Sequence, residues 1–175
     1  MQPKGRRSIQ LRAGLSKGTR MKNFNNKVAA ITGAGSGIGQ QLAVLLAQQG
    51  CHLSLSDVNE QGLAQTAALL QDSGVRVSTH KVNVASLDEM RAWAQDTVQQ
   101  HGAVNMIFNN AGVALGSTVE GAAYEELEWI VGINFWGVVY GTKEFLPLIK
   151  QTGDGCIINI SSLFGLTAQP TQSAD

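Results

Sequence analysis

Cysteine is scarce in this sequence, with two residues in 175, Cys51 and Cys156. They lie about a hundred positions apart, which excludes a disulfide framework and a cysteine-based metal site. Each begins a short apolar run, so we expect two buried thiols in a reducing compartment, and no metal. Long apolar runs are also missing, since none approaches the roughly 18 residues that a membrane span needs. The sequence therefore predicts a soluble, cytoplasmic protein with no membrane partner.

Acidic residues are missing from the first 27 positions, which contain eight Lys and Arg residues. The rest of the chain carries all 13 acidic residues and five basic ones, a net charge of −8. We interpret residues 1–23 as a basic, disordered leader, which a start codon upstream of Met21 would produce. An organellar transit peptide and a loose nucleic-acid-binding arm are alternatives. Because the body is acidic, we expect no nucleic-acid partner.

Charged residues make up only 15% of the chain and apolar residues 43%, which excludes a disordered protein and suffices for a core. From residue 24 onward, short apolar runs alternate with helical patterns, as in parallel strands joined by crossover helices. The predicted strands are 27–32, 52–56, 75–82, 104–108 and 156–160, and the predicted helices are 37–50, 59–72, 86–101 and 124–150. Residues 24–175 are therefore predicted to form one α/β domain, a Rossmann-type doubly wound parallel sheet that binds ligands at the carboxyl ends of its strands.

A glycine-rich turn, "TGAGSGIG" at 32–39, follows the first predicted strand and opens the first predicted helix. Glycines at such a turn allow the backbone to approach a pyrophosphate, which lies at the N-terminus of the following helix. The spacing is GxxxGxG rather than the common GxGxxG, and a plain connection between strand and helix is the alternative. The predicted cofactor contacts in this turn are Thr32, Gly33, Gly35, Ser36, Gly37, Ile38 and Gly39.

The second predicted strand leads into an acidic residue, Asp57. A carboxylate at this place accepts hydrogen bonds from both hydroxyls of an adenosine ribose and repels a 2′-phosphate. Neither position 36 nor position 58 is Lys or Arg, so nothing there offsets the repulsion. The sequence therefore predicts NAD as the cofactor, with NADP less favoured. The alternative is that Asp57 only caps the next helix.

Four motifs together resemble the short-chain dehydrogenase/reductase family in type, order and spacing. They are "TGAGSGIG" at 32–39, "NNAG" at 109–112, "INFWG" at 133–137 and "IINISS" at 157–162. The resemblance runs from about residue 24 to the last residue. It implies the Rossmann-type fold, with five of the family's seven strands present, and a homo-oligomeric assembly.

The resemblance also assigns roles to individual residues. Asn134 would kink its helix and hold a water molecule in a proton relay, and Ser162 would donate a hydrogen bond to the substrate oxygen. Asn83 stands where the family usually has Asp, and its side-chain oxygen can still accept a bond from an adenine amino group. The "NNAG" motif would line the cofactor and tie the central strands together. The cofactor contacts predicted outside the glycine turn and Asp57 are Asn83, Val84, Asn109, Asn110, Ala111 and Gly112.

The activity implied by the resemblance is hydride transfer between NAD(P) and a secondary alcohol or ketone, in which the tyrosine of a YxxxK motif moves the proton. Counted from Ser162, the tyrosine's position falls on Asp175, the last residue. We therefore interpret the chain as an oxidoreductase of this family that is truncated before YxxxK and inactive as given. A non-catalytic dinucleotide-binding module is the alternative. The substrate itself cannot be read from these residues.

Truncation should also uncover apolar surface. The run "CIINI" at 156–160 would become an exposed sheet edge. The helix before it would lose its packing partner, which leaves the family's oligomer interface incomplete. The side chains then expected to face water are Phe135, Val138, Tyr140, Phe145 and Leu146.

Overall fold

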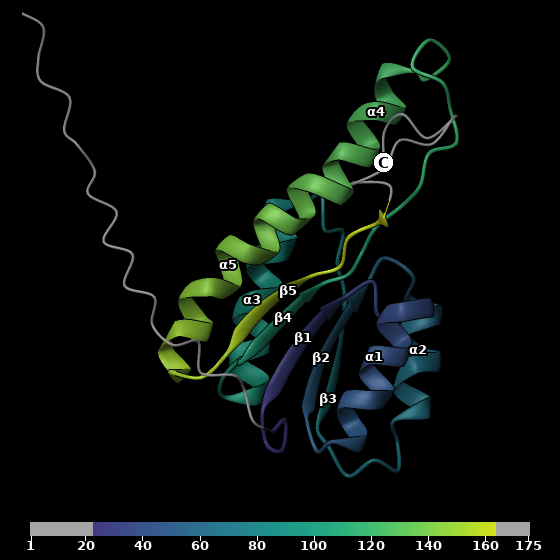
Figure 1. Ribbon diagram of the computed structural model, residues 1–175. Coiled ribbons are helices and arrows are strands. Elements are labelled where there is room, and N and C mark those ends of the chain that lie inside the picture. Colours follow the sequence, from purple (N-terminus) through teal and green to yellow (C-terminus); the bar gives the residue numbers. More distant parts are fainter. Residues whose placement is uncertain (1–22, 164–175) are drawn as a thin grey trace, which may run out of the picture.

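The computed structural model describes residues 23–163, so Asp175 and all but the last residue of the predicted leader lie outside the described residues. Strands and helices alternate along the chain until three consecutive helical segments precede the last strand (Figure 1). The strands are β1 (Val28–Thr32), β2 (His52–Asp57), β3 (Val77–Lys81), β4 (Met106–Asn109) and β5 (Cys156–Asn159). The helices are α1 (Gly37–Gln48), α2 (Glu60–Leu69), α3 (Leu87–His101), α4 (Tyr124–Val131), η1 (Gly132–Trp136) and α5 (Gly137–Thr152).

All five strands form one parallel sheet in the order β3-β2-β1-β4-β5. The central strand β1 pairs with β2 on one side and with β4 on the other, as in Ala29 opposite Leu53 and Met106. The sequence order of the strands reverses at this point, between β1 and β4. The predicted doubly wound parallel sheet is confirmed, and its switch point is where ligands bind in such sheets.

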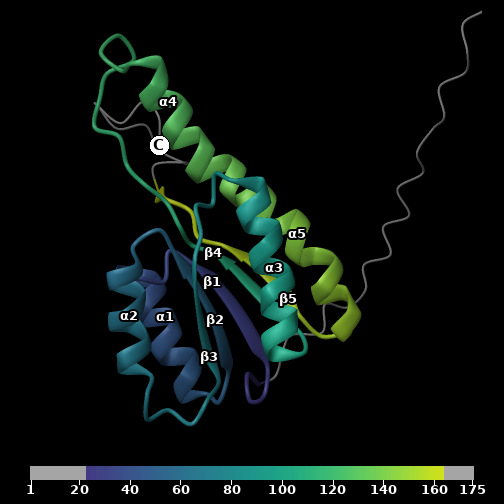
Figure 2. The ribbon, with the colours of Figure 1, turned by 180° about the vertical axis from the view of Figure 1, so that it is seen from behind.

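Helices cover both faces of the sheet, α1 and α2 on one and α3 and α5 on the other (Figures 1 and 2). Successive residues of β1 point to opposite faces, as strand geometry requires. Ala29 and Ile31 belong to the core beneath α1 and α2, and Ala30 belongs to the core beneath α3 and α5. A strand buried on both faces must be apolar throughout, which explains the continuous run at its position in the sequence.

The predicted helix 124–150 is in fact three segments. A π-helical turn, η1, separates α4 from α5, and Gly137 N–H donates to the carbonyl of Gly132 across it. Asn134, a poor helix former, lies inside this turn. None of the helices within residues 23–163 combines the length and the apolar character that crossing a bilayer requires.

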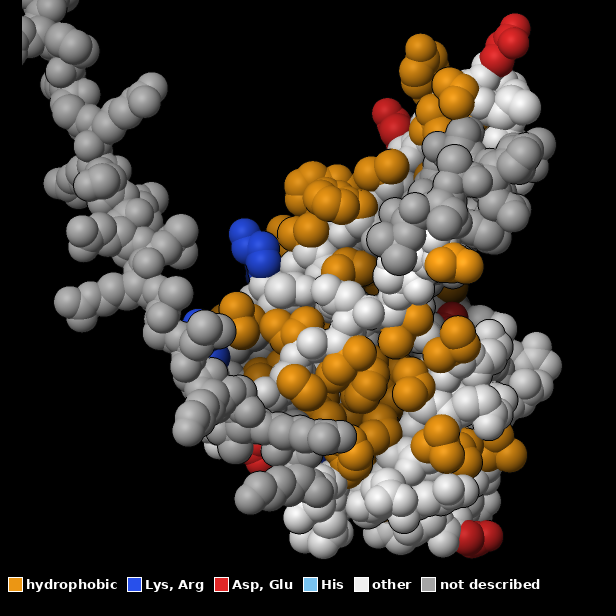
Figure 3. All heavy atoms as spheres, in the orientation of Figure 1, with side chains coloured by type: hydrophobic (Ala, Val, Ile, Leu, Met, Phe, Trp, Pro, Cys, Tyr) orange, Lys and Arg blue, Asp and Glu red, His pale blue; other side chains and the backbone are white. Residues whose placement is uncertain are grey.

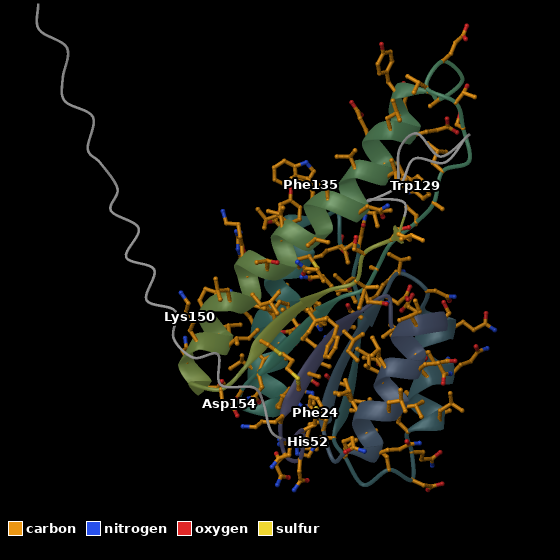
Figure 4. All side chains as sticks on the ribbon, in the orientation of Figure 1. Phe24, His52, Trp129, Phe135, Lys150 and Asp154 are labelled. Atoms are coloured by element: carbon orange, nitrogen blue, oxygen red, sulfur yellow. The ribbon has the colours of Figure 1, made fainter. Side chains whose placement is uncertain are left out.

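Two predictions of burial were wrong. Cys51 is fully buried, and burial raises the pKa of its thiol to about 12, but Cys156 is exposed because β5 forms an edge of the described sheet. Phe145 is fully buried against Trp93, with ring centroids 4.8 Å apart, so it is not part of the expected water-facing patch. Phe135 is 57% exposed and does face water (Figure 4). Apolar side chains also gather over the region of β5 (Figure 3).

Candidate functional site

A cavity of about 380 Å³ opens where β1, β2 and β4 end and where β3 continues into its loop. The glycine turn, the end of β2 and the segment after β4 supply most of its wall, although they are far apart in the sequence. The lining residues are Gly33, Ser36, Gly37, Ile38, Asp57, Val58, Val82, Asn83, Val84, Asn110, Ala111, Gly112, Val113 and Ile133. The cavity therefore lies at the topological switch point of the sheet, at the carboxyl ends of the strands.

The glycine turn needs its glycines for two different reasons. Gly33 and Gly37 have φ angles of +65° and +52°, in the left-handed region that other residues rarely adopt. Gly39 instead has no room for a side chain, because a Cβ there would overlap the carbonyl oxygen of Gly33. This close approach packs the first turn of α1 against the end of β1. The backbone of Gly33 and Gly37 lines the cavity.

Asp57 ties the glycine turn to the end of β2. Its Oδ2 accepts a hydrogen bond of 2.9 Å from Gly35 N–H, and its Oδ1 accepts one of 2.9 Å from Asn59 N–H. The carboxylate is half-buried and lines the cavity. Its negative charge is therefore held at a fixed place in the wall by two backbone donors.

Thr32 and Asn110 join the two halves of the cavity wall. Thr32 Oγ1 accepts from the N–H groups of Asn110 and Ala111 at 2.9 Å each and donates to Phe108 O at 3.3 Å. The Asn110 amide donates to Thr32 O at 2.9 Å and to Gly33 O at 3.3 Å. Thr32 is only 2% exposed, so it shapes the site from behind the wall and does not line it.

The loop after β3 forms the opposite, more apolar part of the wall, with Val82, Asn83 and Val84. The Asn83 side-chain oxygen accepts a 3.0 Å bond from Ala85 N–H, and Asn83 N–H donates to Glu89 Oε2 at 2.8 Å. One acceptor position on the Asn83 oxygen is thus already used within the loop.

Asn134 and Ser162, the predicted catalytic residues, have different surroundings. Asn134 binds the backbone of Val113 twice, since Nδ2 donates to Val113 O at 2.8 Å and Oδ1 accepts from Val113 N–H at 2.9 Å. This pair fixes the segment after β4 against η1, next to the cavity wall at Ile133. Ser162 lies beyond the end of β5, is exposed, and is not among the cavity-lining residues.

Three further residues predicted from the sequence do not line the cavity. Gly35 and Gly39 lie behind the wall, as Thr32 does. Asn109 is buried beside β5, where its amide donates to Asn159 Oδ1 at 2.8 Å.

Sequence reasoning missed four apolar lining residues. Each of the four is a sequence neighbour of a predicted site residue, and this adjacency is the signal that could have identified them. They are Val58, Val82, Val113 and Ile133.

A family model described as short chain dehydrogenase matches residues 27–174, almost the whole chain. The chain belongs to the short-chain dehydrogenase family. The family resemblance inferred from the four motifs is therefore confirmed.

Relatives within this family are similar over most of the chain. The protein named oxidoreductase SadH of Mycobacterium tuberculosis is 47% identical over 154 residues, which are 88% of this chain and 56% of that protein. A cyclohexanol dehydrogenase of Acinetobacter is 38% identical over 82% of this chain and 57% of its own length. The chain thus spans little more than half the length of the curated relatives it matches.

The fold is also that of solved members of the family. The crystal structure of a short chain dehydrogenase/reductase from Burkholderia phymatum in complex with NAD matches with a TM-score of 0.85 and 34% identity. The match covers 88% of this chain and 55% of that one.

Proposed function

We propose that the cavity binds NAD(H) and that the whole protein transfers hydride between this cofactor and a secondary alcohol or ketone. The observation that carries the proposal is the Asp57 carboxylate, which is fixed by Gly35 and Asn59 at the rim of a glycine turn at the sheet's switch point. The NAD-bound relative and the cyclohexanol dehydrogenase support the same assignment by similarity.

Each part of the wall suits one part of the cofactor. The exposed backbone at Gly33 and Gly37, followed by the N-terminus of α1, suits the pyrophosphate. Asp57 suits the hydroxyls of the adenosine ribose, and the apolar side chains of Val58 and Val82 suit the faces of the adenine ring. When bound, the cofactor supplies or accepts the hydride.

The charge of Asp57 should make the cavity select NADH over NADPH. No Lys or Arg is among the fourteen lining residues, so nothing compensates a 2′-phosphate in the described wall. We expect Asp57→Asn to weaken NADH binding by about tenfold, a loss of about 1.4 kcal/mol, and to reduce the preference against NADPH. The amide keeps an oxygen for Gly35 or Asn59, so the turn should stay in place. Titration of NADH and NADPH fluorescence measures both constants.

A matched control for this prediction is Glu60→Gln. Glu60 is an acidic neighbour outside the cavity wall, paired at 2.9 Å with Lys81 in an exposed ion pair. Its removal changes the net charge by the same amount and should leave both dissociation constants within twofold. An equal loss of NADH affinity in both variants would mean that Asp57 acts only through the overall charge.

For catalysis, we propose that Ser162 donates to the substrate oxygen and that Asn134 holds a water for proton transfer. Asp175 stands where the resemblance places the proton-transferring tyrosine, and an ionised, short carboxylate is a poor substitute. We therefore expect the 175-residue chain to bind NADH and to produce none from NAD with cyclohexanol or 2-butanol. Absorbance at the NADH band measures this, and turnover above a protein-free blank would contradict the expectation.

The presence of Asp175 at the position of the family's tyrosine favours a second candidate function, a dinucleotide-binding module without catalysis. The two functions separate in a chimera in which the sequence from Asp175 onward is supplied by the C-terminal part of the cyclohexanol dehydrogenase, including the family's YxxxK motif. Alcohol-dependent NADH formation in that chain supports the oxidoreductase. Its absence, with NADH binding retained, supports the binding module.

We further propose a reducing, cytoplasmic location and self-association. The two free thiols, Cys51 and Cys156, support the first. The second is supported by aromatic side chains exposed along α4 and η1, where Trp129, Phe135 and Trp136 are 49%, 57% and 45% exposed. Apolar surface of this kind is more common at protein interfaces than on isolated chains.

A further inference from the structure

The three histidines of the chain lie in one small region, away from the glycine turn. His52 begins β2 (Figure 4), His80 lies in β3, and His101 is the last residue of α3. Their positions in the sequence give no hint of this grouping, and the proposed cofactor site uses none of them.

A single serine hydroxyl connects two of the three rings. Ser78 Oγ lies 2.9 Å from Nε2 of His101 and 3.0 Å from Nε2 of His80. Ser78 and His101 are only 9% and 6% exposed. The hydroxyl has one proton to donate, so in the neutral state one ring accepts it while the other ring donates its own N–H to the oxygen. Strand β3 is thereby fastened to the end of α3.

The second nitrogen of His101 makes this connection sensitive to protons. Nδ1 is buried and has no hydrogen-bond partner among residues 23–163. A second proton on this ring would therefore create a buried N–H with no acceptor, together with a charge that has lost its water. The ring is accommodated only while it is neutral.

Most of the charged or titratable groups around the three histidine rings carry positive charge when protonated. Arg76 donates from Nη2 to His101 O at 3.2 Å and from its backbone N–H to Nδ1 of His52 at 3.0 Å. Asp96 on α3 is the acidic group that acts on His80. Burial, followed by the charges of Arg76, His52 and His80, lowers the pKa of His101 to about 4. Burial also lowers the pKa of His80, and burial and Arg76 lower that of His52.

We propose that Ser78, His80 and His101 form an acid-sensitive latch that holds β3 on α3 at neutral pH and holds it progressively less firmly in mildly acidic solution. The residues that follow β3, Val82 to Val84, are part of the cavity wall. A less firmly held β3 therefore loosens the cavity wall at these residues.

The direction of the effect follows from proton linkage. In the released state the rings regain ordinary pKa values near 6.5, whereas in the latched state the pKa of His101 lies well below that. Above pH 6.5 both states are neutral, so pH has no effect. Below it the released state binds more protons, and the latch loses stability by up to about tenfold per pH unit for each extra proton. The loss grows until the pH reaches the lower pKa.

Amide hydrogen exchange of the whole 175-residue chain at pH 7 and pH 5 tests the latch. After correction for intrinsic rates, we expect the protection of β3 amides (Val77–Lys81) to fall at least about tenfold more than that of β1 amides (Val28–Thr32). His101→Gln keeps a hydrogen-bonding group toward Ser78 but cannot titrate, so it should remove most of this difference. His52→Gln is the matched control, because His52 does not bind Ser78, and it should leave the difference in place.

Equal losses in β3 and β1, or an unchanged difference in His101→Gln, would overturn the proposal. If His101→Gln does not fold, NMR titration of the histidine ring protons in the unaltered chain decides the matter. We expect His101 to stay neutral down to pH 5, and titration of both His80 and His101 near 6.5 with β3 still protected would overturn the latch. Neither measurement requires that the chain bind a dinucleotide.

Discussion

A Gly39→Ala chain should show no measurable NADH binding and should be less stable by several kcal/mol. The added Cβ would overlap the carbonyl oxygen of Gly33 and come within 2.7 Å of the Asn110 amide nitrogen. The first obstacle is backbone and the second is a side chain held by two hydrogen bonds, so neither can move aside cheaply. Helix α1 must shift away from β1, which costs about 1–3 kcal/mol or more and distorts the turn at the cavity. NADH fluorescence titration and urea unfolding measure the two effects.

Gly116→Ala is the control for this result. A Cβ added to Gly116 meets no atom of the described residues within 4 Å, and the Gly116 backbone is not left-handed, so its alanine variant should bind NADH and unfold as the unaltered chain does. If Gly39→Ala also bound NADH with unaltered affinity, the close contact between α1 and the end of β1 would not be needed for the site.

Trp93→Ala should cause the largest loss of stability among single core substitutions, about 3–5 kcal/mol. Trp93 is 1% exposed, packs edge-on against Phe145, and donates from Nε1 to Ser54 Oγ at 2.9 Å. Ser54 in turn lies 2.8 Å from Thr97 Oγ1. Truncation therefore opens a cavity between α3 and the sheet and also leaves a buried hydroxyl without its donor. The midpoint of urea unfolding reports the change.

Two further variants separate the causes of this loss. Trp93→Phe keeps an aromatic ring for Phe145 but removes the Nε1 donor, so it should cost less than half as much. Trp129→Ala removes the same residue type from a site that is 49% exposed and should cost under about 1 kcal/mol. A similar loss from Trp93→Ala and Trp129→Ala would show that α3 does not pack on the sheet as described.

The centre of the sheet could be predicted from the sequence because β1 and β4 are buried along their whole length and must be largely apolar. That requirement leaves a local signal, and the helices between the strands leave another. Glycines in the turn, such as Gly33 and Gly37, and an acidic residue at the end of β2, Asp57, are local signals too, which is why much of the cavity wall could be anticipated.

Other features depend on segments that are distant in the sequence. Phe145 is buried because Trp93 lies across from it, and Cys156 is exposed because its strand is at an edge of the described sheet. Neither fact can be read from the residues beside them. The role of Asn134 as a hydrogen-bonding support of the wall is equally invisible, since its partner, Val113, lies about 21 positions away. The bonds of Asn110 to Thr32, about 78 positions away, were anticipated only through the family resemblance of the "NNAG" motif. Composition predicts burial only on average.

The strand order has a consequence for how the protein folds. Val28 pairs with His52, whereas Ala29 pairs with Met106, about three times as far along the chain. Closing the longer loop costs more chain entropy, so β1, β2 and β3 should assemble first and β4 should add to them later. The bonds between Thr32 and Asn110 can form only once β4 has joined β1. The cavity is therefore completed by the pairing of longest sequence separation next to β1, and any ligand that binds there stabilises the contact between the two halves of the sheet.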